Sequence, residues 1–496
     1  MWDAYAAGSS GLVHVPTGAG KTYAAYGGPL AEVFDEALEA GDTLLKGVRI
    51  VFVTPLRAVS RDIEKALKAP IKDLGLLDSV VTVESRTGDT STSVRARQRS
   101  RLPSVLITTP ESLTLLLTQR DAAQKFASLR CVIIDEWHEL LSSKRGTQVE
   151  LACARLRTLA KGVRTWALSA TLANLDAAAQ AAVGNAAAAS IISADIDRPV
   201  VIETVLPDAD DPFPWAGHLG LTQMPRVVES IPTDAAGMPT DSTLVFVNTR
   251  SQAERWHHAF HATKPLWAPV IALHHGSLDR DERERVEAGL KDGSARVVIA
   301  TSSLDLGVDF APVERVMQIG SPKGIARLMQ RAGRASHRPG APCKVVCVPT
   351  NALEFIEVAA VRRSIRSGRI EPRSPEKKPL DVLSQHMVSM ALGGGFTPGD
   401  LFREVRTSAA YESLTREEFD WTLHLVTEGG DTLHAYPEYR KVVPGPDGVH
   451  TVNDKRIAML HRFNVGTITG AATMEIRYLS GKRLGSIEES FVQKLR

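Results

Sequence analysis

The chain places Val15-Pro16-Thr17-Gly18-Ala19-Gly20-Lys21-Thr22 directly after Leu12-Val13-His14, a short and mostly apolar run that predicts a β-strand. The glycines of this stretch permit a tight turn whose backbone N–H groups point inward, at the oxygens of a bound phosphate. Lys21 can reach the β- and γ-phosphates of a nucleotide, and the hydroxyl of Thr22 can hold Mg²⁺. A helix is expected directly after this stretch. The strand–loop–helix order predicts a P-loop rather than a chance glycine-rich turn.

An acidic motif, Asp135-Glu136-Trp137-His138, follows the apolar run Cys131-Val132-Ile133-Ile134. Such a run is typical of a buried parallel strand. A carboxylate at the carboxyl end of a parallel strand faces the nucleotide crevice of an open α/β sheet. We therefore expect Asp135 to orient Mg²⁺, directly or through water, and Glu136 to act as general base toward the attacking water. The alternative is an acidic turn without a chemical role, which the P-loop upstream makes less favourable.

Further short strings follow in a fixed order. They are Thr54-Pro55-Leu56-Arg57-Ala58 (motif Ia), Thr108-Thr109-Pro110-Glu111-Ser112-Leu113 (motif Ib), Ser169-Ala170-Thr171-Leu172 (motif III), Leu244-Val245-Phe246-Val247-Asn248-Thr249-Arg250 (motif IV), His274-His275-Gly276-Ser277-Leu278, Ala300-Thr301-Ser302-Ser303-Leu304-Asp305-Leu306-Gly307-Val308-Asp309 (motif V) and Gln330-Arg331-Ala332-Gly333-Arg334 (motif VI). Each string alone is weak, whereas the whole set in order is specific. The ordered set resembles the motifs of superfamily 2 DExH-box helicases, in which Pro-Thr-Gly-x-Gly-Lys-Thr is the usual form of the P-loop.

Longer strings narrow the resemblance. They are Asp135-Glu136-Trp137-His138-Glu139-Leu140-Leu141-Ser142-Ser143-Lys144-Arg145-Gly146-Thr147-Gln148, Pro379-Leu380-Asp381-Val382-Leu383-Ser384-Gln385-His386, Phe419-Asp420-Trp421, Tyr436-Pro437-Glu438-Tyr439 and Asn464-Val465-Gly466-Thr467-Ile468. With these strings the chain resembles the large helicase-related (Lhr) proteins, and among them the bacterial helicases encoded beside an ATP-dependent DNA ligase. The resemblance spans nearly the whole chain.

The expected fold class is α/β, with two tandem RecA-like domains whose parallel sheets carry helices on both faces. Apolar strand candidates alternate with helical stretches, at 48–54, 104–108, 130–134, 164–168, 243–247, 269–273, 296–300, 315–319 and 344–348. Residues 1–198 are expected to form the first RecA-like domain and 199–372 the second. A Pro- and Lys-rich linker precedes a winged helix at 379–450, and 451–496 would begin a truncated β-rich module.

The resemblance assigns a role to each candidate site residue. The expected catalytic residues are Glu136, Asp135, Lys21, Arg334 and Gln330, with Arg334 as the arginine finger toward the γ-phosphate. ATP would be bound by Thr17, Gly18, Ala19, Gly20, Lys21, Thr22, Asp309 and Arg331, and Mg²⁺ by Thr22 and Asp135. Phosphates of the nucleic acid would contact Arg57, Thr109, Thr249, Arg250 and Thr301.

Two pairs within these motifs have plainer alternatives. Ser169 and Thr171 are expected to couple the two domains, although helix-capping hydroxyls would leave the same pattern. Arg331 and Arg334 could instead belong to a solvated basic helix face. Most of the tryptophans are expected in the core or between domains rather than stacked on bases.

The sequence departs from the family pattern at three points. A Phe and a Gln that read adenine in relatives have no counterpart before Trp2, Ser336 replaces a usual Gly, and His337 stands where many relatives carry Arg. The relatives also continue well past Arg496. We therefore expect a front part of a longer protein, trimmed at both ends, with weakened adenine selectivity and impaired processive unwinding.

Composition bounds the remaining possibilities. The formal net charge is +2, which neither supports nor excludes nucleic-acid binding, because a helicase needs a basic track rather than a basic whole. No apolar run of this sequence reaches membrane-spanning length, and we expect no signal peptide ahead of the P-loop. The four cysteines show no zinc spacing and are expected to be buried and reduced, which suits the cytosol. A cytoplasmic monomer, in the bacterial cytosol or nucleoid, is expected.

These observations together favour an ATP-dependent helicase and translocase that moves 3′-to-5′ on single-stranded DNA in DNA repair. An RNA–DNA hybrid is a further expected partner, as are a DNA ligase and a nuclease of the same pathway. Two alternatives stay open at this point. One is a simple P-loop kinase or NTPase, which leaves motifs IV to VI unexplained, and the other is a nucleic-acid-binding fragment with an impaired ATPase.

Overall fold

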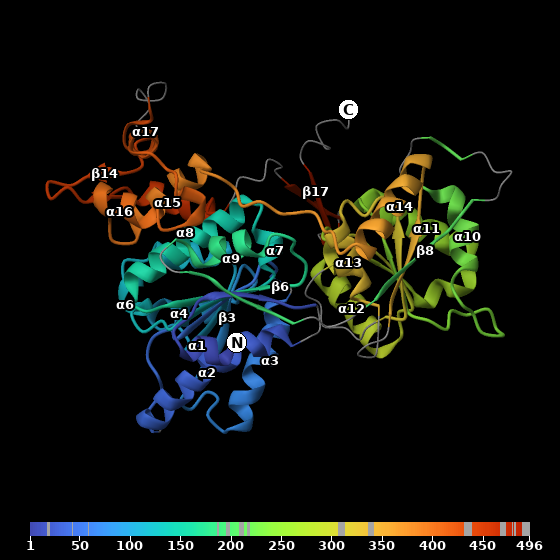
Figure 1. Cartoon of the computed structure of the whole chain (residues 1–496), viewed down its shortest axis with the longest axis horizontal. Helices are drawn as coiled ribbons and strands as arrows, with labels where there is room; N and C mark the ends of the chain where they lie inside the picture. The colour runs from blue at the N-terminus through green and yellow to red at the C-terminus, as the bar shows by residue number, and fades with distance from the viewer. Residues whose placement is uncertain are drawn as a thin grey trace. The chain divides into compact units, whose positions relative to one another are not determined.

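The computed structural model of the chain divides into two compact units, Met1–Ala194 with Pro372–Ile468 and Asp195–Glu371 with Thr469–Arg496 (Figure 1). The chain therefore leaves the first unit, forms the second and returns. The structure describes residues 1–16, 20–41, 43–57, 59–185, 188–194, 199–207, 213–215, 219–305, 313–335, 342–430, 439–466, 473–478, 480 and 483–488.

The first unit is built on a seven-stranded sheet in the order β3-β4-β2-β5-β6-β1-β7, in which every neighbouring pair is parallel. All five strands predicted for this part of the chain, including the one before the P-loop, are confirmed. The strands are β1 (Gly11–His14), β2 (Ile50–Val53), β3 (Val83–Arg86), β4 (Val105–Thr108), β5 (Cys131–Ile134), β6 (Arg164–Ser169) and β7 (Ser190–Ser193).

Helices cover both faces of this sheet, as the alternation of strands and helices predicts. Because successive side chains of a strand point to opposite faces, residues such as Val51 and Phe52 belong to two different hydrophobic clusters. The helices are α1 (Trp2–Ala6), α2 (Lys21–Ala40), α3 (Ser60–Asp73), α4 (Thr92–Ser100), α5 (Pro110–Leu117), α6 (Ala122–Phe126), α7 (Trp137–Leu140), α8 (Lys144–Leu159) and α9 (Leu175–Val183).

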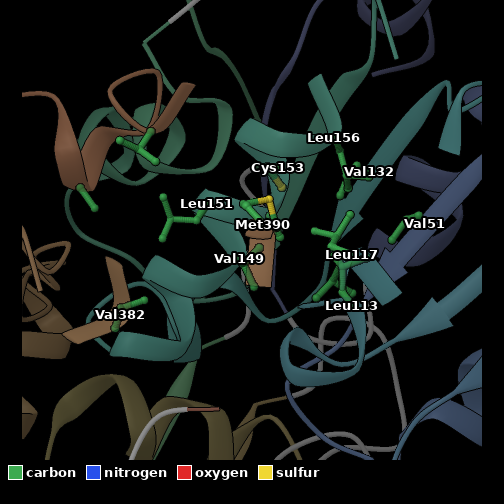
Figure 2. Packing of buried hydrophobic residues seen from close by; sticks show 14 of the residues in the cluster. Val51, Leu113, Leu117, Val132, Val149, Leu151, Cys153, Leu156, Val382 and Met390 are labelled. Carbon is green, nitrogen blue, oxygen red and sulfur yellow. The ribbon is translucent and has the colours of Figure 1, made fainter. Parts of the chain in front are cut away.

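Within the described residues between 379 and 451 the chain forms three helices and a short hairpin, the order predicted for a winged helix. Its elements are α15 (Leu380–Leu392), α16 (Pro398–Val405), the 3₁₀ turn Ala409–Tyr411, α17 (Arg416–Glu428), β14 (Val443–Pro444) and β15 (His450–Thr451). This module packs on the first unit and shares its core. In Figure 2, Val382 and Met390 of α15 lie in one hydrophobic cluster with Leu117 of α5 and Val149 of α8.

The second unit is built on a six-stranded sheet in the order β10-β11-β9-β12-β13-β8, again parallel throughout. All five strands predicted here are confirmed, and β8 is additional. The elements are β8 (Val200–Thr204), α10 (Met224–Glu229), β9 (Thr243–Phe246), α11 (Arg250–Thr263), β10 (Ile271–His274), α12 (Arg280–Asp292), β11 (Val297–Ala300), β12 (Arg315–Ile319), α13 (Ile325–Ala332), β13 (Cys343–Val348) and α14 (Ala352–Arg366).

The region from 451 onward begins with a helix rather than with strands. Helix α19 (Lys455–Phe463) packs on α15 through a hydrogen bond of 2.8 Å between Ser389 Oγ and His461 Nε2. The antiparallel hairpin β16 (Thr473–Arg477) and β17 (Arg483–Glu488) follows.

Burial agrees with the expectations for cysteine and, in the main, for tryptophan. All four cysteines are buried and free. Trp137, Trp166, Trp256 and Trp267 are fully buried, whereas Trp215 and Trp421 are 79% and 56% exposed. None of the helices in the described part of the chain combines the length and hydrophobicity needed to span a lipid bilayer.

Candidate active site and nucleic-acid interface

The candidate residues of the first unit gather at one edge of its sheet. The P-loop follows β1, Arg57 follows β2, Thr109 follows β4, Asp135 follows β5 and Ser169 ends β6. Because these strands are parallel neighbours, all five positions lie at the carboxyl edge, where open α/β sheets bind their ligands.

The described part of the P-loop fits a phosphate group. Gly20 has φ of +79°, a left-handed conformation that a side chain would strain, and it caps the amino terminus of α2. Lys21 is 9% exposed, and its Nζ lies 3.2 Å from the carbonyl oxygen of Val15 and 3.4 Å from that of Pro16. The ammonium group is thus held over the loop at the positive end of a long helix, which is a favourable place for an anion. Thr17, Gly18 and Ala19 lie outside the described residues.

Asp135 is held rigidly beside Lys21. Its side chain is 8% exposed, its N–H donates to the Val53 carbonyl at 2.8 Å, and its Oδ1 accepts the Glu136 N–H at 3.0 Å. Burial raises the pKa of Asp135, and the positive charge of Lys21 opposes that rise. Such a carboxylate gains from a cation placed next to it, as Mg²⁺ would be.

The donor set suits Mg²⁺ bound together with a nucleotide. Asp135 and Thr22 offer a carboxylate and a hydroxyl oxygen, and Mg²⁺ usually takes only one or two protein oxygens beside phosphates and water. Within the described ranges there is no group of three or more His, Cys, Asp or Glu side chains that could hold a metal by itself. A site shared with the phosphates is therefore the arrangement that the residues support.

Glu136 has a backbone conformation that the sequence did not predict. Its φ of +46° and ψ of 44° are left-handed, which for a residue with a side chain costs on the order of 1–3 kcal/mol. Helix α7 begins directly after it. Strain of this kind persists where the surrounding structure over-determines one position, and here it falls on the predicted general base.

His138 connects Glu136 to motif III. The imidazole is fully buried, its Nδ1 lies 3.2 Å from Ser169 Oγ, and its Nε2 lies 3.5 Å from Glu136 Oε2. Burial, followed by the charges of Arg373, Lys21 and His14, lowers the pKa of His138 to about 3. The ring is therefore neutral at physiological pH, and Ser169 is engaged within its own unit. The proposed coupling of the two domains by Ser169 and Thr171 stays a prediction.

Of the predicted phosphate contacts in this unit, Arg57 is exposed and Thr109 is not. A Cβ atom added to Gly88 would lie 2.5 Å from Cζ of Arg57, so the guanidinium lies directly against that glycine. Thr109 is 2% exposed and its Oγ1 caps α5 by accepting the Ser112 N–H at 3.4 Å. Its direct contact with a phosphate stays a prediction.

In the second unit, Thr249 follows β9 and Thr301 follows β11, two neighbouring parallel strands. Thr249 caps α11 by accepting the Gln252 N–H at 3.1 Å, and both Thr249 and Arg250 are exposed. Thr301 is 8% exposed, with Ser303 Oγ at 3.5 Å. The structure therefore brings the three predicted contacts to one edge of this sheet.

Motif VI separates into a buried and a more accessible arginine. Arg331 is 1% exposed, binds Asp305 through Nε–Oδ1 at 2.7 Å and Nη2–Oδ2 at 3.0 Å, donates to Gln318 Oε1, and lies over the Phe246 ring. Arg334 is half-buried and donates to the Asp305 carbonyl at 3.2 Å. Asp305 thus organises both arginines, which favours a packing role for Arg331. Gln330 is 4% exposed, and Asp309 lies outside the described residues.

The comparisons with known proteins agree with this geometry. The DEAD/DEAH box helicase model matches residues 1–178, the helicase conserved C-terminal domain matches 227–340, and the winged helix domain of large helicase-related protein matches 363–496. The chain is 31% identical, over 498 residues, to the ATP-dependent helicase Lhr-Core of Methanocaldococcus jannaschii. The chain belongs to the Lhr-type helicases. That alignment covers 98% of this Lhr-type chain and 57% of the relative, so the chain spans about half the length of the curated relatives it matches.

Two further comparisons concern mycobacterial Lhr. The chain is 32% identical over 465 residues to the Lhr helicase/probable uracil glycosylase of Mycolicibacterium smegmatis, covering 86% of this chain and 30% of that one. A solved structure of Mycobacterium smegmatis helicase Lhr, bound to ssDNA and AMP-PNP, superposes with a TM-score of 0.78 at 30% identity, over 96% of this chain and 60% of that chain. The two RecA-like folds and the winged helix predicted from the sequence are confirmed.

Sequence reasoning missed several residues of this Lhr-type site. Asp305 lies inside the quoted motif V string, where an acidic residue in an otherwise apolar and hydroxyl-rich run was a usable signal. Glu371, at the end of the second unit, accepts the Ala326 N–H of α13 at 3.1 Å, and nothing local marks it. Arg145 and Arg373 likewise bind partners far away in the sequence, so their roles emerge only from the fold.

Proposed function

We propose that this Lhr-type chain is an ATP-dependent helicase and translocase that moves 3′-to-5′ along single-stranded DNA. The observation that carries the proposal is the placement of Lys21, Asp135 and Glu136 at one sheet edge, with the exposed Arg57 on the same edge. The binding of ssDNA and AMP-PNP by mycobacterial Lhr supports both the nucleotide and the strand.

Each residue of the first unit has a distinct task in this proposal. Lys21 binds the phosphates, and Thr22 and Asp135 would hold Mg²⁺, which would supply neutralisation of the charge that develops on the phosphates. Glu136 accepts the proton of the attacking water, with its position fixed by the start of α7. Binding of the phosphates by backbone N–H groups of Thr17 to Gly20 stays a prediction from the sequence.

The second unit completes the proposed chemistry. Arg334 stabilises the charge on the γ-phosphate and Gln330 orders the attacking water, while a role of Asp309 in ATP binding stays a prediction from the sequence. Thr249, Arg250 and Thr301 bind successive backbone phosphates, as do Arg57 and Thr109. Such contacts grip a strand without reading its bases, which suits translocation along any sequence.

The physiological setting is proposed from the resemblance to ligase-associated helicases. We infer a role in DNA repair, in the bacterial cytosol or nucleoid, as a monomer with a DNA ligase and a nuclease as pathway partners. An RNA–DNA hybrid is proposed as a second nucleic-acid partner, beside single-stranded DNA. Copurification of the ligase with this chain from its own cells is the test of the partner proposal, and absence of the ligase at native expression would contradict it.

The central experiment measures ATP turnover with and without a single-stranded oligonucleotide of about 20 bases, which exceeds the several nucleotides bound per site. We expect stimulation, with a half-maximal DNA concentration that rises with salt because counterions are released on binding. Turnover indifferent to DNA would favour the simple NTPase. DNA binding without turnover would favour the impaired fragment. Strand displacement on matched 3′- and 5′-tailed duplexes then tests direction, with Glu136→Gln as the inactive control.

A further inference from the structure

Arg373 lies in the linker that leads from the second unit back to the first, outside every motif of the family pattern. Its guanidinium reaches the DExH motif: Nη1 donates to the carbonyl oxygen of His138 and forms an ion pair with Glu139 Oε1 at 3.2 Å. The side chain is only 20% exposed, so this charge is largely removed from solvent. Hydrogen bonds that carry a charge are the stronger kind, because ionic donors bind acceptors at short range.

The element that Arg373 holds determines where Glu136 lies. Helix α7 has only four residues, Trp137–Leu140, and begins immediately after Glu136. A helix this short has almost no stability of its own, because nucleation is costly and few hydrogen bonds repay it. Its orientation must come from tertiary contacts. Because Glu136 directly precedes α7 and has a left-handed φ, the position of the Glu136 carboxylate depends on how α7 is oriented.

The backbone of Arg373 is fixed as well as its side chain. Asn174, which follows motif III, donates from Nδ2 to the Arg373 carbonyl at 2.9 Å and accepts the Arg373 N–H on Oδ1 at 3.1 Å. Both backbone polar groups of Arg373 are thus satisfied by one side chain. Since Ser169 Oγ also lies 3.2 Å from His138 Nδ1, the start of α7 is bound both by motif III and by the linker.

We propose that Arg373 is a positioning residue for ATP hydrolysis, which holds α7 through His138 and Glu139 and so orients the carboxylate of Glu136. This inference rests on the proposed function, in which Glu136 is the general base. It assigns to the linker a part in hydrolysis, in addition to its part in connecting the second unit with the winged helix.

The test compares steady-state ATP hydrolysis of the chain and its variants at saturating single-stranded DNA. Arg373→Ala should lower kcat by about tenfold, the loss typical of one charge-assisted hydrogen bond, with KM for ATP within about twofold. Arg373→Lys keeps the charge but not the planar guanidinium, so its kcat should lie between those of the parent chain and Arg373→Ala. Lys377→Ala is the matched control: it removes an exposed positive charge from the same linker and should match the parent chain.

A double variant separates positioning from a general loss of structure. In the Glu136→Gln background there is no general base left to orient, so adding Arg373→Ala should lower the residual rate no further. Asn174→Ala, which releases only the backbone of Arg373, should lower kcat in the same direction. If Arg373→Ala does not fold, as judged by thermal unfolding, Arg373→Lys and Asn174→Ala carry the comparison.

The outcomes distinguish this inference from the proposed function. A parent chain without DNA-stimulated hydrolysis contradicts the function itself. If Arg373→Ala hydrolyses ATP as fast as the parent chain and Lys377→Ala, the proposed function stands and only the positioning role of Arg373 is overturned. Additive losses in the double variant, or a rise in KM that accounts for the whole effect, overturn it as well.

Discussion

Arg145 forms a two-point ion pair with Glu111, with Nε to Oε1 at 2.6 Å and Nη2 to Oε2 at 3.2 Å. The same Nη2 donates to the Pro55 carbonyl at 2.9 Å. Burial raises the pKa of Glu111, but the hydrogen bonds and the charge of Arg145 outweigh burial and hold this pKa below its ordinary value. One side chain at the start of α8 therefore joins motif Ia to motif Ib, the two loops that carry the predicted phosphate contacts of the first unit.

Removing this link should loosen the grip on DNA more than it affects chemistry. For Arg145→Ala we expect the DNA concentration for half-maximal ATPase stimulation to rise by roughly fivefold or more, the size of a modest coupling between sites, while kcat at saturating DNA changes little. Titration of ATP turnover with single-stranded DNA measures both quantities. Lys144→Ala is the matched control, since Lys144 binds the half-exposed Asp381 instead.

A second pair of variants controls for the unpaired carboxylate that Arg145→Ala leaves. Arg145→Met with Glu111→Met removes both charges at similar volume, a change that is often neutral for stability. It should show the same DNA defect with an unfolding temperature near that of the parent chain. An unchanged half-maximal concentration in both variants would rule out the link between the loops.

The assignments of Lys21 and Glu136 predict two different defects. Glu136→Gln should bind ATP normally and lose turnover by about 10²- to 10⁴-fold, since only the proton acceptor is removed. Lys21→Ala should weaken nucleotide binding as well, because Lys21 holds the phosphates. Equilibrium binding of a fluorescent ATP analogue, beside steady-state hydrolysis, separates the two. Undiminished turnover in a folded Glu136→Gln protein would refute the general-base assignment.

Replacing the two arginines of motif VI should affect different properties: stability for Arg331 and ATP hydrolysis for Arg334. Arg331→Ala leaves Asp305 buried without its main partner, which should destabilise the second unit by about 3–5 kcal/mol. Arg334→Ala should leave stability nearly unchanged and lower hydrolysis by roughly 10³-fold or more, as expected for an arginine finger. Thermal unfolding and ATP turnover of both variants decide the matter. Equal loss of stability in the two variants would contradict this division of roles.

The strands that were predicted from the sequence and those that were not differ in their position in the two large sheets. The predicted strands include every interior strand of the two large sheets, and most of these are apolar runs because a parallel interior strand is buried on both faces. The three strands without a prediction, β3, β7 and β8, are all at sheet edges. Val83-Glu84-Ser85-Arg86 shows why: an edge strand tolerates polar side chains, so no apolar run marks it.

The candidate site shows the same limit. Lys21, Asp135 and Arg57 were predictable because each follows a recognisable strand in a parallel sheet, so that their common edge follows from the topology alone. Arg145 and Arg373 were not, because their tasks depend on partners such as Pro55 and His138 that only the packed fold brings near. The winged helix was predicted as an element, but its shared core with α5 and α8 was not, since no local pattern specifies which surface a helix will cover.

The contact between α8 and the winged helix makes stability depend on pH. Glu150 of α8 is 2% exposed and accepts the Ala410 N–H at 2.8 Å, and burial raises its pKa to about 8. In the unfolded chain the same group titrates near 4.3. Below that pH, Glu150 is protonated in both the folded and the unfolded chain, so its ionisation does not change the free energy of unfolding. As pH rises from there toward 8, the unfolded chain releases the proton more readily, so stability falls across that interval.

Glu150→Gln tests this prediction, because glutamine keeps the hydrogen bond to Ala410 but cannot ionise. The variant should match the parent chain near pH 4 and unfold at a higher temperature than the parent at pH 8 to 9, where the parent must bury a carboxylate. Thermal unfolding measured across this pH range gives both curves. The control is Glu412→Gln, a change at an exposed glutamate just beyond the same 3₁₀ turn, which should leave the pH dependence as it was. Parallel curves for the parent chain and Glu150→Gln would show that Glu150 is ionised in the folded protein and that the proposed pH dependence of the contact is wrong.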